Sequence, residues 1–292
     1  MQKIVAFLFL FTSLITFSQN QASEPIQVPF VLTPEGHIII QAKVNGIDGT
    51  FIFDTGAGIN LITQKFGDKV GSLEETHHFY TGHRATGEAL QANLWNYDSL
   101  QIGDFIEANG QTAVLNFDFP IDGLISLTPF KNQPFTIDFE NKLLTIESPQ
   151  SLDQIRSEAD FETPLAITND RNISLDIFAH VFLNDTLELL VGLDSGAGFG
   201  VYRFSSRYME TLGVNSTQIK NEFRPSPFNP DEGNMYYFTK LDKLSSLDKK
   251  SGVENFNATF IDGLIYEGIT GLDWIGQKIT IDLPNQKMFV IK

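Results

Sequence analysis

The sequence contains no cysteine among its 292 residues. This absence excludes a disulfide framework, a thiolate metal site, a cysteine nucleophile and a thioether lipid anchor. Basic residues are also scarce, with 20 Lys and Arg against 36 Asp and Glu, which gives a formal net charge of −16 at pH 7. Because binding to a phosphate backbone requires clustered Lys and Arg, we expect no nucleic-acid partner.

Long hydrophobic runs are absent after the first segment. A positively charged start at residues 1–3 precedes an uncharged apolar run over residues 4–17, and small residues then favour cleavage after Ser18. A permanent anchor is the alternative, but a membrane-spanning helix needs about 20 apolar residues. We therefore predict a signal peptide over residues 1–18, no stable membrane anchor, and export to the periplasm, the cell surface or the medium.

Phenylalanine, glycine and proline are abundant, with 26, 23 and 12 copies. This composition is typical of many short strands and turns rather than long helices. A hydrophobic content of 42% provides ample material for a core. We predict an all-β protein.

The sequence after the signal peptide contains an internal repeat. Each copy begins with two apolar runs around a turn signal, residues 37–44 and 50–53 around Asn45-Gly46, and residues 173–183 and 187–193 around Asn184-Asp185. Such a pattern predicts a β-hairpin in each copy. Further on, each copy has a helix-compatible stretch, at residues 61–70 and 204–213, and a closing strand, at residues 135–139 and 279–283. We therefore expect an N-terminal lobe over residues 26–147, a polar linker over 148–162 and a C-terminal lobe over 163–292.

Both predicted hairpins run into nearly identical pentapeptides, Asp54-Thr55-Gly56-Ala57-Gly58 and Asp194-Ser195-Gly196-Ala197-Gly198. Glycine after the hydroxyl residue has no Cβ, so two such loops can approach closely across a lobe interface. Thr55 and Ser195 can hold this arrangement by hydrogen bonds to backbone or to the opposite loop. Gly56 and Gly196 would shape the site with them.

This arrangement would place the carboxylates of Asp54 and Asp194 side by side. Two carboxylates that share a site do not both ionise readily, so the pair holds one proton and titrates as a unit. Such a dyad can deprotonate a water molecule and protonate a carbonyl or a leaving amine. The chemistry is amide hydrolysis without a covalent intermediate, and it requires neither a metal nor a cofactor.

The sequence resembles the aspartic proteases, and most of all the bacterial retropepsin-like aspartyl proteases, here with two lobes in one chain. Asp54-Thr55-Gly56 and Asp194-Ser195-Gly196 match the family's catalytic triplets. The resemblance implies a bilobal fold with two similar β-barrel-like lobes and short helices. It also implies an element of two hydrophobic residues and a glycine under each catalytic loop. Residues 268–272 fit that element, whereas residues 122–127 have Ser126 in the glycine position.

The resemblance further implies a β-hairpin flap over the substrate. Residues 79–87 are the candidate flap, and Tyr80, Gly82 and His83 are its candidate substrate-binding residues. An ordinary surface hairpin is the alternative interpretation. In the C-terminal lobe, residues 223–237 are Pro-rich and indicate a substrate-side loop rather than a regular flap.

Several alternatives compete with peptide hydrolysis. The two aspartates could be turn residues, since Asp and Gly favour turns. Asp-Ser-Gly-x-Gly loops also bind phosphates in actin-like nucleotide-binding proteins, although an exported chain would meet little ATP. The fold could instead serve a catalytically inactive peptide-binding pseudoprotease. Paired carboxylates also occur in glycosidases, but the two tryptophans are few for a sugar site.

The favoured hypothesis is an aspartic endopeptidase that acts on a peptide or protein substrate. Asp54 and Asp194 would be its catalytic residues. His77, His78 and His83 lack the acidic or cysteine partners of a regular ligand pattern, so we expect no metal site. Because one chain supplies both triplets, we expect a monomer.

Overall fold

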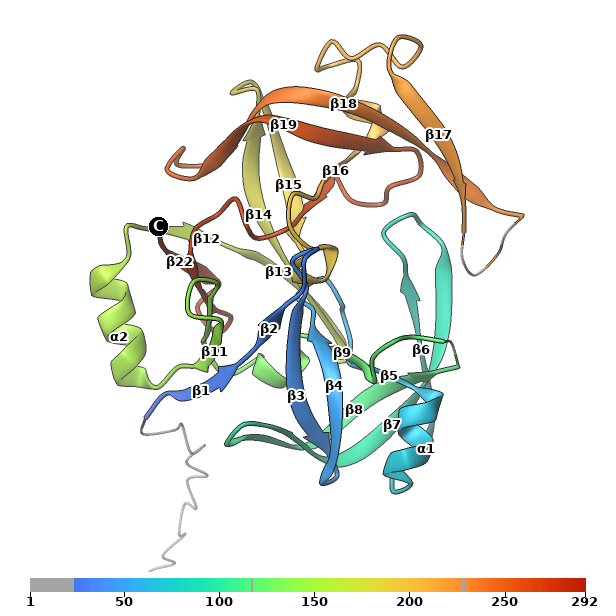
Figure 1. The fold of residues 1–292 in the computed structure, drawn as a ribbon, viewed down its shortest axis with the longest axis vertical. Helices are drawn as coiled ribbons and strands as arrows, with labels where there is room; N and C mark the ends of the chain where they lie inside the picture. The colour runs from blue at the N-terminus through green and yellow to red at the C-terminus, as the bar shows by residue number, and fades with distance from the viewer. Residues whose placement is uncertain (1–23, 117, 227–228, 230) are drawn as a thin grey trace, which may run out of the picture.

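The structure is a computed structural model that describes residues 24–116, 118–226, 229 and 231–292. The expected signal peptide, residues 1–18, lies outside the described residues. The described elements are mostly strands, which form three sheets (Figure 1). The prediction of an all-β fold is confirmed. Among the described residues, no helix is both long enough and apolar enough to cross a membrane.

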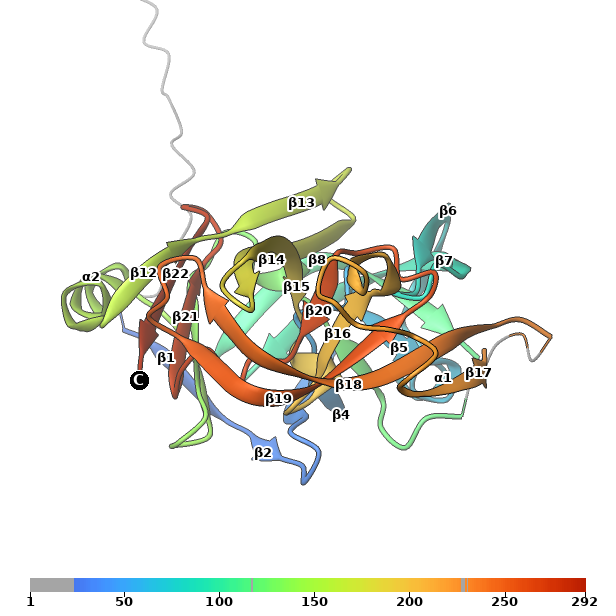
Figure 2. The ribbon, with the colours of Figure 1, turned by 90° about the horizontal axis from the view of Figure 1, so that it is seen from above.

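The first sheet has eight strands and forms the N-terminal lobe (Figure 1). Its strands, in spatial order, are β2 (Val31–Leu32), β3 (Ile38–Val44), β4 (Ile47–Phe53), β9 (Gly123–Ile125), β5 (Leu61–Thr63), β8 (Phe105–Leu115), β7 (Ala89–Ile102) and β6 (Glu74–His83). The long β6–β7 hairpin forms one edge of this sheet, so its far end projects from the lobe (Figure 2).

The second sheet also has eight strands and forms the C-terminal lobe. Its strands, in spatial order, are β13 (Ala166–Asp170), β14 (Ser174–Leu183), β15 (Leu187–Leu193), β20 (Gly268–Thr270), β16 (Tyr202–Ser205), β19 (Gly252–Ile261), β18 (Gly233–Ser246) and β17 (Lys220–Pro225). The two sheets therefore have the same strand order, one strand for another. The extra pairings β3–β7 and β14–β18 also correspond.

The third sheet connects the two halves of the chain. Its six strands, in spatial order, are β1 (Ile26–Pro29), β11 (Leu143–Ile146), β10 (Phe135–Asp138), β21 (Lys278–Asp282), β22 (Lys287–Ile291) and β12 (Phe161–Pro164). At its centre β10 pairs with β21 in antiparallel register, with Thr136 opposite Thr280. Their hydroxyl oxygens lie 2.7 Å apart in the buried interior. The closing strands of the two halves are therefore joined by main-chain and side-chain hydrogen bonds.

Matching turns close the first hairpin of each lobe. Asn45 and Gly46 both have positive φ, and so do Asn184 and Asp185. Positive φ at both central residues gives a turn whose twist suits a two-residue β-hairpin, and Asn, Asp and Gly tolerate it best. The Oδ1 atom of Asn45 also accepts hydrogen bonds from two amides of β7, and that of Asn184 accepts two from β18. Each turn therefore also holds a long strand of its own lobe, β7 in the first and β18 in the second.

The helices differ from the sequence predictions in one lobe. In the N-terminal lobe, β5 leads into α1 (Gln64–Val70), which begins at the cap Thr63 and ends at Gly71. In the C-terminal lobe, a helix was predicted over residues 204–213, and this prediction is wrong. β16 occupies the first part, a single 3₁₀ turn, η3 (Ser206–Tyr208), follows, and Gly213 has positive φ. Phe204 is fully buried as a strand residue, so tertiary packing decides the local structure.

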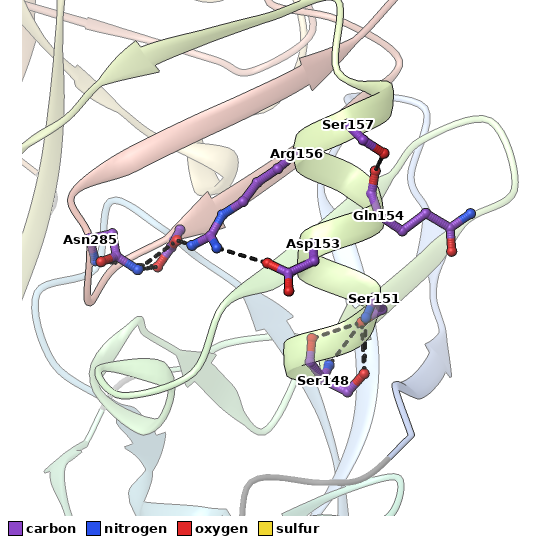
Figure 3. A network of polar contacts seen from close by, with 8 residues as sticks. Ser148, Ser151, Asp153, Gln154, Arg156, Ser157 and Asn285 are labelled. Carbon is purple, nitrogen blue, oxygen red and sulfur yellow. Dashed lines mark hydrogen bonds and ion pairs between the residues drawn. The ribbon is translucent and has the colours of Figure 1, made fainter.

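The stretch expected as a linker contains the helix α2 (Pro149–Glu158) and the start of β12. Ser148 caps this helix, and its side chain exchanges hydrogen bonds with Ser151 in a capping box (Figure 3). Arg156 reaches from the helix to Asp282 at the end of β21, with 3.0 Å between Nη2 and Oδ2. These contacts hold the helix against the connecting sheet.

Aromatic side chains fill the core beneath the Asp54-Thr55-Gly56 triplet. Phe53, the last residue of β4, is fully buried and meets Phe130 and Phe135 edge-on, with ring centroids 5.5 Å apart in both cases. Phe130 belongs to the 3₁₀ turn η1 (Thr128–Phe130), and Phe135 begins the connecting sheet. The strand that leads to Asp54 therefore ends in a buried aromatic cluster.

Candidate active site

Asp54 and Asp194 occupy equivalent positions at the ends of β4 and β15. β4 pairs in parallel with β9, and β15 pairs in parallel with β20. The amide of Asp54 donates to the carbonyl oxygen of Ile125 at 2.9 Å, and that of Asp194 donates to the carbonyl oxygen of Thr270, also at 2.9 Å. Each aspartate is thus fixed by the last main-chain contact of a buried strand pair.

Thr55 and Ser195 bind each other across the lobe interface. The amide of Thr55 donates to Oγ of Ser195, and the amide of Ser195 donates to Oγ1 of Thr55, both at 2.9 Å. Each hydroxyl then donates to the opposite strand, Thr55 to the carbonyl oxygen of Leu193 at 2.7 Å and Ser195 to that of Phe53 at 2.8 Å. Both side chains are buried. The two triplets therefore form one reciprocal hydrogen-bonded unit.

Gly56 and Gly196 allow the two loops to approach. A Cβ atom on Gly56 would lie 2.4 Å from Cγ of Asp194, and one on Gly196 would lie 2.3 Å from Cγ of Asp54. Either distance is far below van der Waals contact. Each carboxylate therefore lies against the glycine of the other triplet, and a side chain at either glycine would displace it.

Backbone amides fix the orientation of both carboxylates. The Oδ1 atom of Asp54 accepts hydrogen bonds from the amides of Gly56 and Ala57, at 2.9 and 3.1 Å. The Oδ1 atom of Asp194 accepts one from the amide of Ala197 at 2.9 Å. Hydrogen bonds to a carboxylate favour its ionised form, so these contacts stabilise one negative charge in the site.

Burial and mutual repulsion oppose a second negative charge. Burial raises the pKa of Asp54 well above its ordinary value of 3.8, and the charge of Asp194 raises it further. Burial also raises the pKa of Asp194, whereas the hydrogen bond with Asp54 and the amide of Ala197 lower it. Two coupled carboxyl groups lose their protons in two steps that belong to the pair. Between these two steps the pair holds one proton between two carboxylates.

The support below each catalytic turn differs between the lobes. Ser126, in the position where the family has glycine, is fully buried, and its amide and hydroxyl both donate to Oδ1 of Asn60, at 2.9 and 3.0 Å. In the C-terminal lobe, Gly271 takes the same position, and its amide donates to the carbonyl oxygen of Val201 at 2.9 Å. The serine is therefore accommodated because its amide and hydroxyl donate to the side chain of Asn60, whereas the amide of Gly271 donates to a main-chain carbonyl oxygen.

The candidate flap is a regular hairpin whose tip touches the C-terminal lobe. Its tip spans residues 84–88, between β6 and β7. The carbonyl oxygen of Ala85 accepts a hydrogen bond from the amide of Ile265 at 3.0 Å, and Glu88 Oε2 accepts one from the hydroxyl of Ser226 at 2.5 Å. Arg84 also pairs with Glu88 at 2.9 Å. The hairpin therefore bridges the two lobes above the catalytic loops.

The corresponding hairpin of the C-terminal lobe is also regular. The sequence indicated a substrate-side loop over residues 223–237, but β17 and β18 pair in register there, with Phe223 opposite Met235 and Pro225 opposite Gly233. Pro225 ends β17, where the missing amide donor costs the sheet little. The prediction of a substrate-side loop in place of a regular hairpin is therefore wrong for residues 223–225 and 233–237.

The flap and the two triplets enclose a cleft with two cavities. The larger cavity, about 320 Å³, is lined by Asp54, Tyr80, Gly82 and His83 together with apolar residues of the N-terminal lobe. The smaller cavity, about 80 Å³, is lined by Asp194 and again by His83. The structure thus brings both aspartates and all three candidate flap residues to one cleft. Within the described residues, no group of three or more His, Asp or Glu could hold a metal ion.

Two residues of this cleft were not identified from the sequence. Asp176, near the start of β14, and Tyr266, in the loop before β20, line both cavities. Burial raises the pKa of Tyr266 to about 12, and the charge of Asp176 contributes. Tyr266 lies outside the repeated stretches. Asp176 lies within the repeated run of residues 173–183, and the signal that could have identified it is that residues 37–44 of the first copy contain no acidic residue.

Together these features define an all-β protein with paired Asp-Thr/Ser-Gly turns in one cleft. Residues 40–128 match the family model described as aspartyl protease. This match confirms the resemblance to the aspartic protease family and supports an aspartic-type protease activity. The matched stretch includes Asp54, the candidate flap and Ser126. No curated protein matches the chain significantly.

Proposed function

We propose that the protein is an aspartic endopeptidase in which Asp54 and Asp194 activate a water molecule for attack on a peptide bond. The observation that carries this proposal is the reciprocal hydrogen bonding of Thr55 and Ser195, which brings two equivalent strand ends into one site. The close approach of each carboxylate to the glycine of the opposite triplet also supports a shared dyad.

The proposed reaction begins with one ionised and one protonated carboxyl group. The ionised group accepts a proton from water as the water oxygen attacks the peptide carbonyl carbon, and the protonated group donates to the carbonyl oxygen. The resulting gem-diol intermediate is neutral. In the collapse, the group that accepted the water proton donates it to the leaving nitrogen, the other carboxylate accepts a proton from a diol hydroxyl, and the C–N bond breaks, so the pair again holds one proton. No covalent bond to the protein forms at any step.

The β6–β7 hairpin is the proposed flap. Tyr80, Gly82 and His83 line the cleft, and the tip contacts the C-terminal lobe, so a bound peptide would lie beneath the hairpin. Closure over the substrate would exclude water from the reacting bond and strengthen electrostatic interactions with the dyad. The hairpin must open for an extended peptide to enter.

The proposal also includes the wider organisation of the chain. Residues 26–147 and 163–292 would act as two lobes of a monomer, because both triplets come from one chain. Residues 1–18 would direct export, so the substrate would be an extracytoplasmic peptide or protein. A native mass measurement and N-terminal sequencing of the secreted protein test these points.

The decisive experiment compares the wild-type protein with Asp54→Asn and Asp194→Asn against a peptide library at acidic and neutral pH. We expect cleavage by the wild type, inhibition by pepstatin, and a loss of about 1000-fold or more in kcat/KM for each variant, because acid–base catalysis by a positioned group contributes about 10²–10⁴-fold. Asp48→Asn, at an exposed position near the start of β4, is the matched control.

Full activity in either dyad variant contradicts the shared-proton mechanism. Peptide binding by a wild-type protein that cleaves nothing supports the pseudoprotease alternative instead. Binding of ATP in solution would support the nucleotide-binding alternative.

A further inference from the structure

Asp176 places a third carboxylate in the cleft. Asp176 lines both cavities, together with Gly56, His83 and Tyr266. It lies close enough to Asp194 for the two charges to interact. The hydroxyl of Ser174 is 3.4 Å from its Oδ2 atom, a long hydrogen bond. The mechanism proposed above does not use this group.

No cation neutralises Asp176 within the described part of the chain. No nitrogen of a described Lys, Arg or His side chain lies within 4.0 Å of its carboxylate. Arg84, which lines the larger cavity, pairs with Glu88. Burial raises the pKa of Asp176, and the hydrogen bonds with Ser174 and Thr168 lower it without outweighing the burial. A cationic ligand would supply the missing partner.

The walls beside Asp176 are largely apolar. Leu61, Leu90, Leu115 and Leu124 line the larger cavity, and Ile269 lines the smaller one. Lysine and arginine bury an aliphatic stem along apolar surface while their charged end seeks a polar partner. The cleft combines these two requirements, since an apolar wall leads to a carboxylate.

Other substrate chemistries fit the cleft less well. An acidic side chain would meet the negative charge of Asp176 and the single negative charge that Asp54 and Asp194 share. A purely apolar side chain would exclude water from Asp176 without giving it a partner, and a buried charge without a partner is costly. We infer that Asp176 is a specificity-determining residue that selects substrate peptides with a Lys or Arg side chain near the scissile bond, an inference that rests on the proposed endopeptidase function.

The test uses pairs of peptides that differ in a single side chain, Lys or norleucine. The two side chains have the same aliphatic stem, so the pair isolates the ammonium group. The substitution is moved in turn through the three positions on each side of the cleaved bond. At one position we expect the wild type to favour Lys over norleucine by about tenfold in kcat/KM, the usual scale of a hydrogen bond to a charged group.

Three variants test whether the preference for Lys depends on the carboxylate of Asp176. Asp176→Asn keeps the size of the side chain and should abolish the preference while it retains cleavage of the norleucine peptide. Asp176→Glu keeps the charge and should retain a preference for Lys. Asp48→Asn removes the same charge from a side chain that is 77% exposed, and it should behave as the wild type. An unchanged Lys preference in Asp176→Asn, or no preference in the wild type, overturns the inference.

A binding measurement separates this inference from the proposed function. Peptides with a reduced, uncleavable bond are titrated into the wild type and Asp176→Asn by calorimetry. If the wild type cleaves no peptide but binds the Lys form about tenfold more tightly through Asp176, the inference holds and the endopeptidase function is wrong. If cleavage occurs and neither measurement depends on Asp176, the function holds and the inference is wrong. Equal binding of both peptides by a wild type that cleaves neither contradicts both.

Discussion

The two lobes hold Asp54 and Asp194 by the same main-chain contacts but support their turns differently. In the N-terminal lobe, Asn60 receives Ser126 and also donates to the phenol oxygen of Tyr97 at 3.0 Å. In the C-terminal lobe, Gly271 takes the position of Ser126, and its amide donates to the main-chain carbonyl oxygen of Val201 instead of to a side chain. The geometry of the site is therefore kept by the strand ends and the reciprocal hydrogen bonds, while the packing beneath them has diverged.

The surroundings of the turns differ as well. α1 follows the first triplet, whereas a strand and a single 3₁₀ turn follow the second. The flap of the N-terminal lobe reaches across to the other lobe, and Asn234 Nδ2 lies 3.4 Å from the carbonyl oxygen of Thr86 in its tip. The two lobes share a strand order, but the N-terminal lobe provides the hairpin over the cleft and the C-terminal lobe provides the residues that the hairpin tip contacts.

Exchanging the two supports should have unequal effects. In Gly271→Ser the new Cβ would lie 2.2 Å from the carbonyl oxygen of Gly198, so we expect the free energy of unfolding to fall by about 3 kcal/mol. Ser126→Gly removes a hydroxyl that donates to Asn60 and accepts from the amide of Thr128 at 3.2 Å, but it leaves the amide of residue 126 paired, so we expect a smaller loss of about 2 kcal/mol. Chemical denaturation measures both, and equal losses would mean that the two supports do not differ as described.

Removing the hydroxyl of Thr55 or that of Ser195 should lower the free energy of unfolding by nearly equal amounts. Thr55→Val and Ser195→Ala each leave an amide of the opposite triplet and a strand carbonyl without their partners, so each should lose about 2 kcal/mol. The double variant should lose less than the sum, because residues in one network couple. Thr186→Val, at an exposed turn, is the control. Strict additivity would show that the two hydroxyls act independently.

The contact between the flap and the C-terminal lobe should have the smallest effect. Ser226→Ala removes the hydroxyl that donates to Glu88, and we expect KM to rise about threefold with little change in kcat, the scale of one hydrogen bond. The hydrogen bond from Ser226 lowers the pKa of Glu88 from its ordinary value of 4.5, and Arg84 adds to this. The contact is therefore fully present above pH 4.5 and is lost as the pH falls through the lower folded-state pKa.

Steady-state kinetics at pH 6 and at the lowest pH that the fold tolerates check this prediction. The ratio of the KM of Ser226→Ala to that of the wild type should approach one at low pH. Ser157→Ala, on the exposed face of α2, serves as the control. A ratio that does not change with pH would argue that Glu88 is not part of the contact.

Local patterns in the sequence identified the features that depend on a few neighbouring residues. The paired triplets, the two hairpin turns with Asn at positive φ, and the flap hairpin are all encoded within short stretches. The all-β class followed from composition. These features need little tertiary information, since turn geometry and strand alternation are properties of the local chain.

The features that sequence analysis missed depend on distant contacts. Residues 204–213 carry a helix-compatible pattern, but pairing of β16 with β19 and β20 extends the first of them into a strand. Asp176 joins the cleft because β14 packs beside the second triplet, a neighbour that its own sequence context does not reveal. The fit of Ser126 likewise depends on Asn60, which lies 66 residues away in the chain.

The central claim is that Asp54 and Asp194 act as one coupled acid–base pair. Its most direct test is the pH dependence of kcat/KM for a norleucine peptide, with Asp176→Asn as a control for titration of the third carboxylate. We predict a bell-shaped profile. Activity should fall at low pH as the remaining carboxylate gains a proton, and at higher pH as the shared proton leaves the carboxyl group whose pKa lies well above 3.8. A profile with a single limb, or one in which either limb disappears in Asp176→Asn, would contradict this account.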